Sequence, residues 1–397
     1  MFATKETKMT KKRHLRRREA IIQHIDSSIF KAYDIRGTYP EQINEDVVYR
    51  IARAYAQKLK PSVTVVGRDM RVSGPSLLET IRRGVMDEGS DVIDIDMTTT
   101  SMYYYAVNAF NAAAGIVVTA SHNPEQYNGL KLTGTGAAPS VDFVNNDELH
   151  KIADEGHFMQ STRVGKLENA SEPIDSYMKA VRDTSGIKDF GGLKLVIDAG
   201  NGMEGIVLPK LLQNADCDVT PLFWEPDGRF PNHEANPLKE ETLAGLKQKL
   251  SEIGANLGVA YDGDGDRVGF VDEKGQHIPG DIVTAILAKR MLQDKPGALI
   301  IYDVRSSWAV REEIENAGGR PLMWKCRHDL IKKKMHETGA YFAGELSCHY
   351  YFANFHVTDN GDLVLLNMIQ IMLSEGKTLS ELAKPIMRYF HSPEINF

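Results

Sequence analysis

Short apolar runs alternate with amphipathic stretches through most of this 397-residue chain, and this alternation restricts the fold more than any other feature. The apolar runs predict β-strands, and several of the stretches between them have helical spacing. Such alternation is typical of α/β layers built on mixed, mostly parallel sheets. The predicted strands are residues 63–67, 92–96, 115–119, 193–198, 257–261, 268–272 and 298–304, and the predicted helices are 76–88, 240–253 and 281–292.

Two interruptions divide this pattern. Polar residues and Pro173 break it near 156–172, and a second break lies near 272–280. The chain is long enough to form several cores. We therefore expect three consecutive α/β units, each a sheet sandwiched by helices. The expected ranges are 27–166, 167–276 and 277–388, with a leader at 1–26 and a short final piece at 389–397.

Charge and cysteine usage exclude several classes of protein. The net charge of -7 argues against a general nucleic-acid binder, and no apolar run reaches the length that spans a membrane. The three cysteines lie far apart and lack CxxC spacing, which fits a reduced, cytoplasmic protein. The sequence does not indicate an oligomeric state.

The first 18 residues are strongly basic, with eight Lys or Arg and one acid, Glu6. A nucleic-acid-binding arm or a targeting peptide would have such a composition. No apolar segment follows, which argues against secretion. We interpret the segment as a solvated leader.

An acidic loop lies between two predicted strands and reads YDGDGDR from Tyr261 to Arg267. Asp262, Asp264 and Asp266 alternate with glycines, which permit a tight turn that brings the three carboxylates round one cation. Three clustered acids would repel one another without a counter-ion. Because an all-aspartate site suits magnesium rather than zinc, we expect one Mg²⁺ per chain.

Two alternatives remain for this loop. An EF-hand would use the same aspartates together with Glu273, but Arg267 stands where that loop needs glycine, and strands rather than helices flank it. The other alternative is a purely structural acidic turn.

A serine, Ser121, follows a predicted buried strand at the point where the chain turns. Ala120 before it and Pro124 after it suit a sharply held loop, although a serine at such a place is most often a turn or cap residue. His122 and, on the following strand, Lys131 bring potential positive charge close to Ser121. That charge suits a phosphate better than a neutral hydroxyl.

Five segments carry long motifs: YDIRG from Tyr33, TASHNPEQYNGLK around Ser121, PNHEANP from Pro231, YDGDGDRVGF from Tyr261 and GELSCHYYF from Gly344. They resemble, in the same order, the signature segments of the α-D-phosphohexomutase family. The resemblance runs from about Phe30 to the C-terminus. It implies a mutase that interconverts hexose 6-phosphate and hexose 1-phosphate, of mannose, glucose or both, through a phosphoserine and a hexose 1,6-bisphosphate.

The resemblance also implies roles for individual residues. Phosphoryl transfer needs positioning and charge neutralisation more than covalent help, so a metal bound by the three aspartates and Ser121 would stabilise the leaving serine oxygen. His349 would exchange a proton with the sugar hydroxyl, and Glu345 and Ser347 would bind ring hydroxyls. The other candidates are His122, Lys131 and His328 for catalysis, and Tyr33, Arg36, Arg267 and Arg305 for substrate binding.

Several features depart from the family pattern. Cys348 and Arg327 replace glycines, and Arg305 replaces the usual lysine, which keeps the charge but cannot readily give up a proton. The family also has a fourth domain that grips the non-reacting phosphate. This chain ends about where that domain would begin, so we expect a raised KM and a reduced kcat.

Two other functions remain open. Gly200, Gly202 and Gly205 form a GxGxxG turn after a predicted strand, with Glu225 near the place of a ribose contact, as in an NAD-dependent oxidoreductase. The resemblance implies that this turn is structural. The second alternative is a non-catalytic remnant that binds sugar phosphate, which the departures and the early end of the chain favour.

Overall fold

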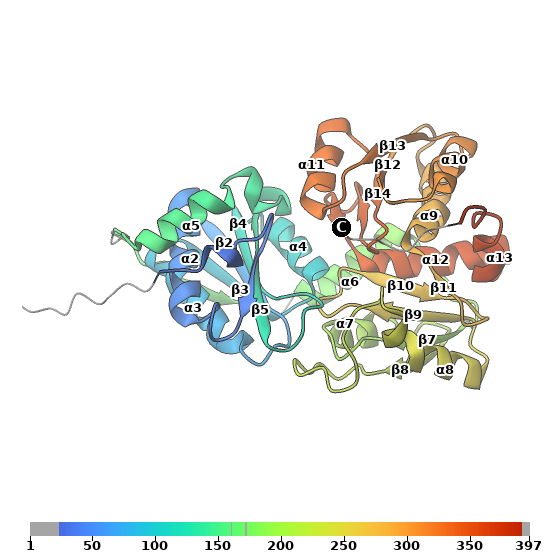
Figure 1. Cartoon of the computed structure of the whole chain (residues 1–397), viewed down its shortest axis with the longest axis horizontal. Helices are drawn as coiled ribbons and strands as arrows, with labels where there is room; N and C mark the ends of the chain where they lie inside the picture. The colour runs from blue at the N-terminus through green and yellow to red at the C-terminus, as the bar shows by residue number, and fades with distance from the viewer. Residues whose placement is uncertain (1–23, 160, 171–172, 391–397) are drawn as a thin grey trace, which may run out of the picture.

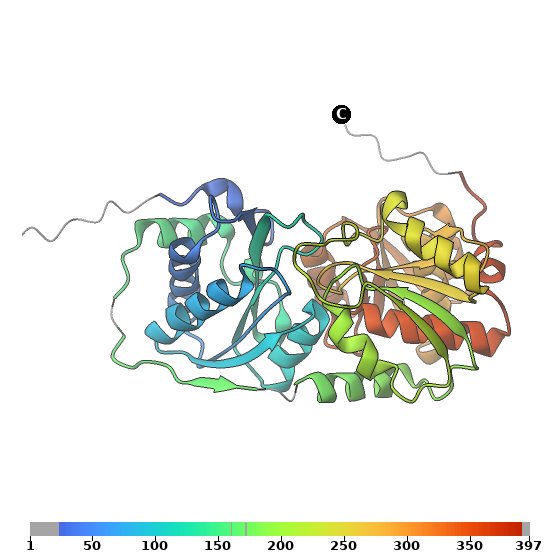
Figure 2. The same cartoon turned by 90° about the horizontal axis from the view of Figure 1, so that it is seen from below.

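A computed structural model describes residues 24–159, 161–170 and 173–390. Most of the basic leader and most of the final piece at 389–397 lie outside these ranges. The described chain forms three sheets, each covered by helices, and we call a sheet with its helices a unit. Two views at right angles place the first unit to one side of the other two (Figures 1 and 2).

The sheet of the first unit has the strand order β1-β5-β4-β2-β3-β6, and three of its five strand pairs are parallel. Neighbouring residues of a strand face opposite sides. Val66 therefore shares a core with α2, α3 and α5, whereas Val65 shares one with α4. The elements are η1 (Ser27–Ile29), β1 (Ile35–Thr38), α2 (Glu45–Leu59), β2 (Val63–Arg68), α3 (Gly74–Asp87), β3 (Asp91–Met97), α4 (Thr100–Ala109), β4 (Ala114–Val118), β5 (Tyr127–Gly134), η2 (Thr135–Ala137), η3 (Ser140–Asp142), α5 (Asn146–Glu155) and β6 (Leu167–Asn169).

The sheet of the second unit has the order β11-β10-β9-β7-β8, and two of its four pairs are parallel. Ile197 packs with α6 and α7 on one face, and Val196 packs with α8 on the other. The elements are α6 (Pro173–Ser185), β7 (Lys194–Asp198), α7 (Glu204–Leu211), β8 (Asp218–Leu222), η4 (Glu240–Leu243), α8 (Ala244–Ile253), β9 (Leu257–Tyr261), β10 (Val268–Val271) and β11 (His277–Ile278).

The sheet of the third unit has the order β13-β12-β14-β15-β16, again with two parallel pairs of four. Ile300 packs with α9, α10 and α12, and Ile301 packs with α11 on the opposite face. The elements are α9 (Gly280–Asp294), β12 (Leu299–Asp303), α10 (Trp308–Asn316), β13 (Arg320–Trp324), α11 (His328–Thr338), β14 (Phe342–Gly344), β15 (Tyr350–Phe352), β16 (Thr358–Asp359), α12 (Gly361–Glu375) and α13 (Leu379–Ala383).

Helix α12 joins the cores of the second and third units. It lies between their two sheets (Figure 1), and its residues Leu363, Leu366 and Ile369 belong to one cluster with side chains of both sheets. Asn360 begins the helix, because its side chain accepts a hydrogen bond of 2.8 Å from the N–H of Leu363. A helix that is apolar on nearly all sides is stable only when it is buried in this way. Among the helices of the described ranges, none has both the length and the apolar character needed to span a bilayer.

Truncation of a side chain in this shared core tests its importance. Leu366→Ala removes a fully buried side chain from between two sheets, so we expect the free energy of unfolding to fall by about 2–5 kcal/mol. Urea denaturation followed by circular dichroism measures the change. Leu238→Ala is the matched control, since Leu238 is 37% exposed. Equal losses in the two variants would contradict the shared core.

Candidate active site

The serine loop and the acidic loop meet where β4 and β9 end. Ser121 Oγ donates a hydrogen bond of 2.9 Å to Asp262 Oδ2, across 141 residues of sequence. Ser121 has a φ of 52°, a left-handed conformation that costs a serine free energy. Gly263 permits the close approach, because a Cβ there would lie 2.7 Å from the carbonyl oxygen of Ser121. The predicted serine and the predicted metal loop therefore belong to one site.

The acidic loop forms a buried cluster of carboxylates. One oxygen from each of Asp262, Asp264 and Asp266 lies within 4.8 Å of the others, and none of the three residues is more than 2% exposed. Asp264 Oδ1 and Asp266 Oδ1 accept no hydrogen bond from any described residue. Buried charged oxygens of this kind are costly unless a cation binds them. The unpartnered oxygens and the all-oxygen donor set fit a hard divalent metal ion.

Lys131 of β5 neutralises part of this charge. Its Nζ donates to Asp264 Oδ2 and Asp266 Oδ2, both at 2.6 Å. Burial opposes the charged amine, but the two carboxylates raise the pKa of Lys131 well above its usual value. Burial would likewise raise the pKa of Asp266, yet Lys131 holds it well below the ordinary range.

Asp262 behaves differently from the other two aspartates. Burial, together with the charges of Asp266 and Asp264, raises the pKa of Asp262 well above its usual value. The carboxylate that contacts Ser121 is therefore the one whose charge is least stable in the absence of a further cation. A metal ion would therefore stabilise the charged form of Asp262 more than the charged forms of the other two aspartates.

Arg71 holds the serine loop, although the sequence analysis did not single it out. Its guanidinium, 1% exposed, donates hydrogen bonds to four carbonyl oxygens of that loop, those of Ser121, Asn123, Pro124 and Tyr127. Five donors in a rigid fork allow one arginine to make all these contacts. The only sequence signal was a charged residue a few positions beyond the predicted strand 63–67.

His122 lies beside the serine, with its Nδ1 3.2 Å from Ser121 Oγ. Burial lowers its pKa to about 2, assisted by the charges of Arg267 and Arg36. His122 is therefore neutral at ordinary pH and does not add the positive charge expected near Ser121. Arg36 lies against the same loop and donates a hydrogen bond of 2.8 Å to Asn123 Oδ1.

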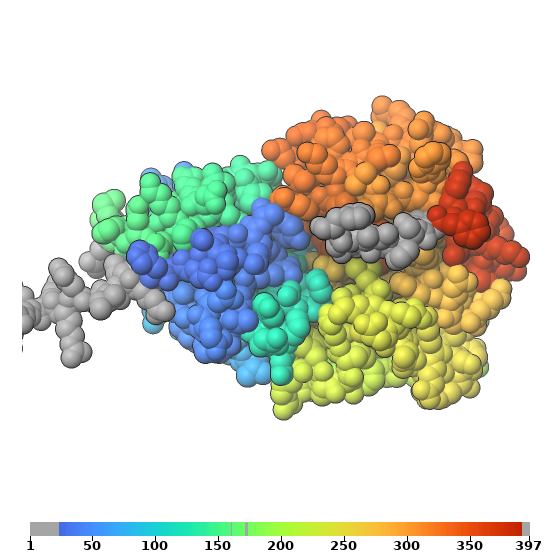
Figure 3. Space-filling view, in the orientation of Figure 1, coloured from blue at the N-terminus to red at the C-terminus, as the bar shows by residue number. Residues whose placement is uncertain are grey.

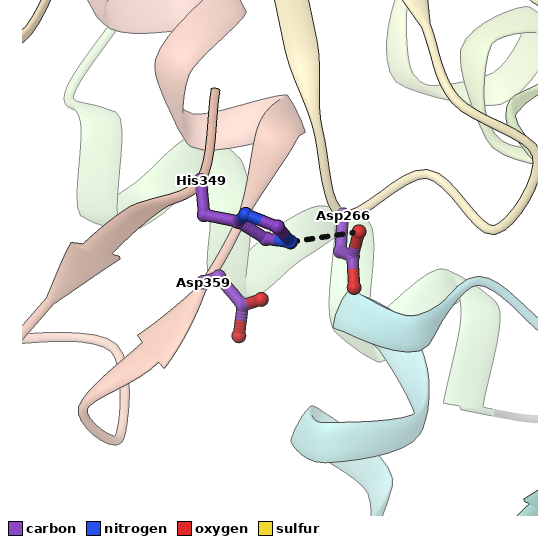
Figure 4. A group of neighbouring side chains, drawn as sticks. All are labelled: Asp266, His349 and Asp359. Atoms are coloured by element: carbon purple, nitrogen blue, oxygen red, sulfur yellow. Dashed lines mark ion pairs between the residues drawn. The ribbon is translucent and has the colours of Figure 1, made fainter. Parts of the chain in front are cut away.

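The loop between β14 and β15 reaches the acidic cluster from the third unit. His349 Nε2 lies 3.5 Å from Asp266 Oδ1 (Figure 4) and accepts a hydrogen bond of 3.3 Å from Arg267 Nε. On the other side of the ring, Nδ1 lies 3.3 Å from Ser347 Oγ and 3.6 Å from Glu345 Oε2. One imidazole thus connects the predicted sugar loop with the predicted metal loop.

The remaining candidate residues complete the same set of contacts. Arg305 Nη2 pairs with Asp303 Oδ2 at 2.6 Å and lies 3.5 Å from Ser347 Oγ. Tyr33 of the first unit packs edge-on against His328 of the third, with ring centroids 4.4 Å apart. The structure therefore brings all candidate residues together at the meeting point of the three units, whose surfaces adjoin in the space-filling view (Figure 3).

A buried ion pair that the sequence analysis did not predict lies beside this cluster. Lys332 Nζ is 2.6 Å from Asp359 Oδ1 and 3.8 Å from the ring centroid of Tyr104. Asp359 in turn groups with His349 and Asp266 (Figure 4). The pair fixes α11 against β16 and against α4 of the first unit.

The glycine-rich turn supports the metal loop. A Cβ on Gly202 would lie 2.8 Å from the carbonyl oxygen of Gly263, and the N–H of Met203 donates to that oxygen at 2.9 Å. Gly205 lies against the backbone of Trp224, where a Cβ would meet the carbonyl oxygen at 1.7 Å. Gly202 and Gly205 thus lie against protein backbone and are not free for the close approach of a pyrophosphate, which removes the basis of the oxidoreductase alternative. β-strands on both sides of the acidic loop likewise exclude an EF-hand.

Two of the departures from the expected pattern occur where glycine would be favoured. Cys348 has a φ of 66° and Arg327 a φ of 100°. Residues with a side chain rarely adopt such backbone angles, and each residue that does so costs on the order of 1–3 kcal/mol of stability. Both positions thus keep the backbone of a glycine while carrying a side chain.

Comparison with known proteins gives consistent matches. The family models for phosphoglucomutase/phosphomannomutase alpha/beta/alpha domains I, II and III match residues 27–158, 175–275 and 279–390. A phosphomannomutase/phosphoglucomutase of Pseudomonas putida is 38% identical over 378 residues, covering 94% of this chain and 80% of the relative. The phosphomannomutase of Escherichia coli strain K12 is 38% identical, covering 92% and 82%.

Solved structures of the same family are also similar to this chain. A phosphoglucomutase/phosphomannomutase family protein of Burkholderia thailandensis superposes with a TM-score of 0.85 at 34% identity, covering 93% of this chain and 81% of the other. Sequence and structure therefore select the same relatives.

Gly263→Ala tests whether the two loops must touch. Its Cβ would push against the Ser121 carbonyl, and we expect the affinity for Mn²⁺ or Mg²⁺ to fall about tenfold, as for other changes around metal ligands. Isothermal titration calorimetry measures it. Gly245→Ala is the matched control, since a Cβ there meets nothing within 4 Å. Unchanged affinity in Gly263→Ala would contradict the tight contact.

The neutral state of His122 predicts a pH dependence of stability. Below a pH of about 6.5 the unfolded chain binds a proton at this residue that the folded chain does not, so stability falls as the pH drops. Between about pH 6 and 5, the free energy of unfolding should fall by about 1 kcal/mol more in the wild type than in His122→Gln. Urea titrations of metal-free protein measure both slopes, and equal slopes would refute the neutral histidine.

Proposed function

Because the chain belongs to the phosphoglucomutase/phosphomannomutase family, we propose that Ser121 carries the phosphoryl group that it transfers. The protein is a hexose phosphate mutase, an intramolecular phosphotransferase. We propose that it interconverts hexose 6-phosphate and hexose 1-phosphate through a phosphoserine and a hexose 1,6-bisphosphate. The observation that supports Ser121 most directly is its hydrogen bond of 2.9 Å to Asp262.

We further propose that the metal is Mg²⁺, bound by Asp262, Asp264, Asp266 and an oxygen of phospho-Ser121. Oxygen-only ligands in a compact cluster favour this ion. When bound, it would act as a Lewis acid that withdraws charge from the phosphoserine. Lys131 lowers the pKa of Asp264 and of Asp266, so these two ligands are ionised before a metal binds.

In the proposed reaction, His349 carries the proton and the Ser121 oxygen carries the negative charge. As the P–O bond to Ser121 breaks and a P–O bond to the sugar forms, His349 takes the proton of the attacking hydroxyl. The Ser121 oxygen keeps its negative charge, stabilised by the surrounding cations. In the second half, that oxygen attacks the other phosphate of the bisphosphate, and His349 returns its proton to the departing sugar oxygen.

Contacts from the third unit support the position of His349. Ser347 and Glu345 lie next to its Nδ1, and Arg267 donates to its Nε2, so the ring is held from both sides. We assign Glu345 and Ser347 to the sugar hydroxyls, and Tyr33, Arg36, Arg267 and Arg305 to the phosphates. His328 stays in this set as a candidate catalytic residue, packed against Tyr33.

We also propose the domain ranges 27–166, 167–276 and 277–388 for the three units. A cytoplasmic location fits the three free cysteines, Cys217, Cys326 and Cys348. Hexose phosphates and the hexose 1,6-bisphosphate are the proposed partners.

Replacement of the serine tests the proposal. Ser121→Ala removes the group that accepts the phosphoryl, and we expect mutase activity with mannose 1-phosphate and glucose 1-phosphate to fall by at least about a thousandfold. A coupled assay measures the rate, and mass spectrometry of the 115–131 region measures phosphate on the serine.

The exposed Ser251→Ala on α8 is the control and should keep full activity. Chelation with EDTA should abolish wild-type activity, and Mg²⁺ should restore it. Substantial turnover in Ser121→Ala, or phosphate found on a different serine of active enzyme, would overturn the assignment.

A further inference from the structure

Arg327 occupies an unfavourable backbone position at the start of α11. Its φ of 100° lies in a region that glycine adopts freely and other residues rarely do. Strained residues persist where the surrounding structure holds them, and they concentrate at functional positions. The arginine side chain is therefore expected to make contacts that a glycine at this position could not make.

The side chain bridges the third unit and the first. Its Nε and Nη2 donate to the two carboxylate oxygens of Asp329, at 3.0 and 2.6 Å, which fixes the guanidinium on the third unit. Nη2 also donates to the carbonyl oxygen of Ala32 at 3.3 Å, and the guanidinium lies 5.3 Å from the ring centroid of Tyr33. Both of these partners belong to the first unit.

This bridge adjoins the proposed sugar loop. The backbone N–H of Arg327 donates to Glu345 Oε1 at 2.9 Å, and Tyr33 packs on His328, the next residue along. The side chain of Arg327 is still 39% exposed. The contact therefore lies at the solvent side of the site rather than in its interior.

The first and third units also touch at a second, more deeply buried place. There Lys332 lies over the ring of Tyr104, and Ser101 Oγ donates to the carbonyl oxygen of Asp359 at 3.3 Å. These contacts of α4 are buried, unlike the bridge of Arg327. The Arg327 bridge, in contrast, could open without disrupting the core.

We propose that Arg327 is a strap that retains the hexose 1,6-bisphosphate between its two phosphoryl transfers. This inference rests on the proposed function, since the bisphosphate must reverse its orientation within the site before the second transfer. The bridge from Asp329 to Ala32 and Tyr33 crosses the solvent side of the site, next to Glu345, and so obstructs the exit of the intermediate. Arg327 is a positioning residue in this account and takes no part in the chemical step.

Arg327→Gly tests the strap with little risk to folding, because glycine suits the observed backbone. We expect the fraction of hexose 1,6-bisphosphate that escapes per turnover to rise about tenfold, the size expected for losing a hydrogen bond from a charged group. Purified phospho-enzyme is mixed with glucose 1-phosphate, and free glucose 1,6-bisphosphate is measured by mass spectrometry after rapid filtration. With saturating glucose 1,6-bisphosphate added, kcat should stay within about twofold of the wild type.

Two further variants complete the experiment. Arg311→Gln removes an arginine that pairs with Glu315 on α10, away from the site, and should leave the escape unchanged. Arg327→Lys keeps the charge but not the two-pronged anchor to Asp329, and should give an intermediate escape.

Equal escape in Arg327→Gly and the wild type would refute the strap while leaving the mutase function standing. A large loss of kcat in Arg327→Gly, even with added bisphosphate, would also refute it, because the residue would then act in the chemical step. Failure of the wild-type enzyme to transfer phosphate at all would instead refute the proposed function, and the strap with it.

Discussion

The structure of the site depends on the concentration of negative charge in the acidic loop. Three buried carboxylates converge there, and Lys131 is the cation that contacts two of them. The third, Asp262, contacts Ser121 and has the pKa least compatible with a charged state. A divalent cation at this point would offset the remaining negative charge, and it would do so next to the hydroxyl of Ser121.

The fold serves this arrangement by bringing loops from different units into contact. Arg71 donates hydrogen bonds to the carbonyl oxygens of the serine loop, and the glycine-rich turn of the second unit packs against Gly263. Helix α12 joins the second and third units through one core, so the sugar loop and the metal loop keep a fixed relation. The first unit has cores of its own, and its α4 also contributes Met102 to the shared core. Arg327 bridges the first and third units away from that core, at the surface.

Much of the fold and site followed from local patterns. All seven predicted strands are present to within two residues of their predicted ends, and alternating aspartates in a glycine-rich turn identified the carboxylate cluster. The unpredicted features are long-range ones. Helix α12 is apolar on nearly every side and so lacks the periodicity that marks a helix, and nothing near Arg71 in sequence reveals that its partners lie some fifty residues away. The antiparallel strands β5, β10 and β15 make the sheets more mixed than alternation of strands and helices suggests. Arg327 was noted as a departure, but its contact with Ala32 spans 295 residues.

The central proposal is that a metal bound by the three aspartates would also bind an oxygen of the phosphate on Ser121. Electron–nuclear double resonance of the phosphorylated enzyme loaded with Mn²⁺ measures this directly, through the coupling between the unpaired electrons of manganese and phosphorus-31. The account predicts a strong phosphorus coupling that disappears when the phosphate is removed from the protein. Tight Mn²⁺ binding with no such coupling in the phosphorylated enzyme would contradict it.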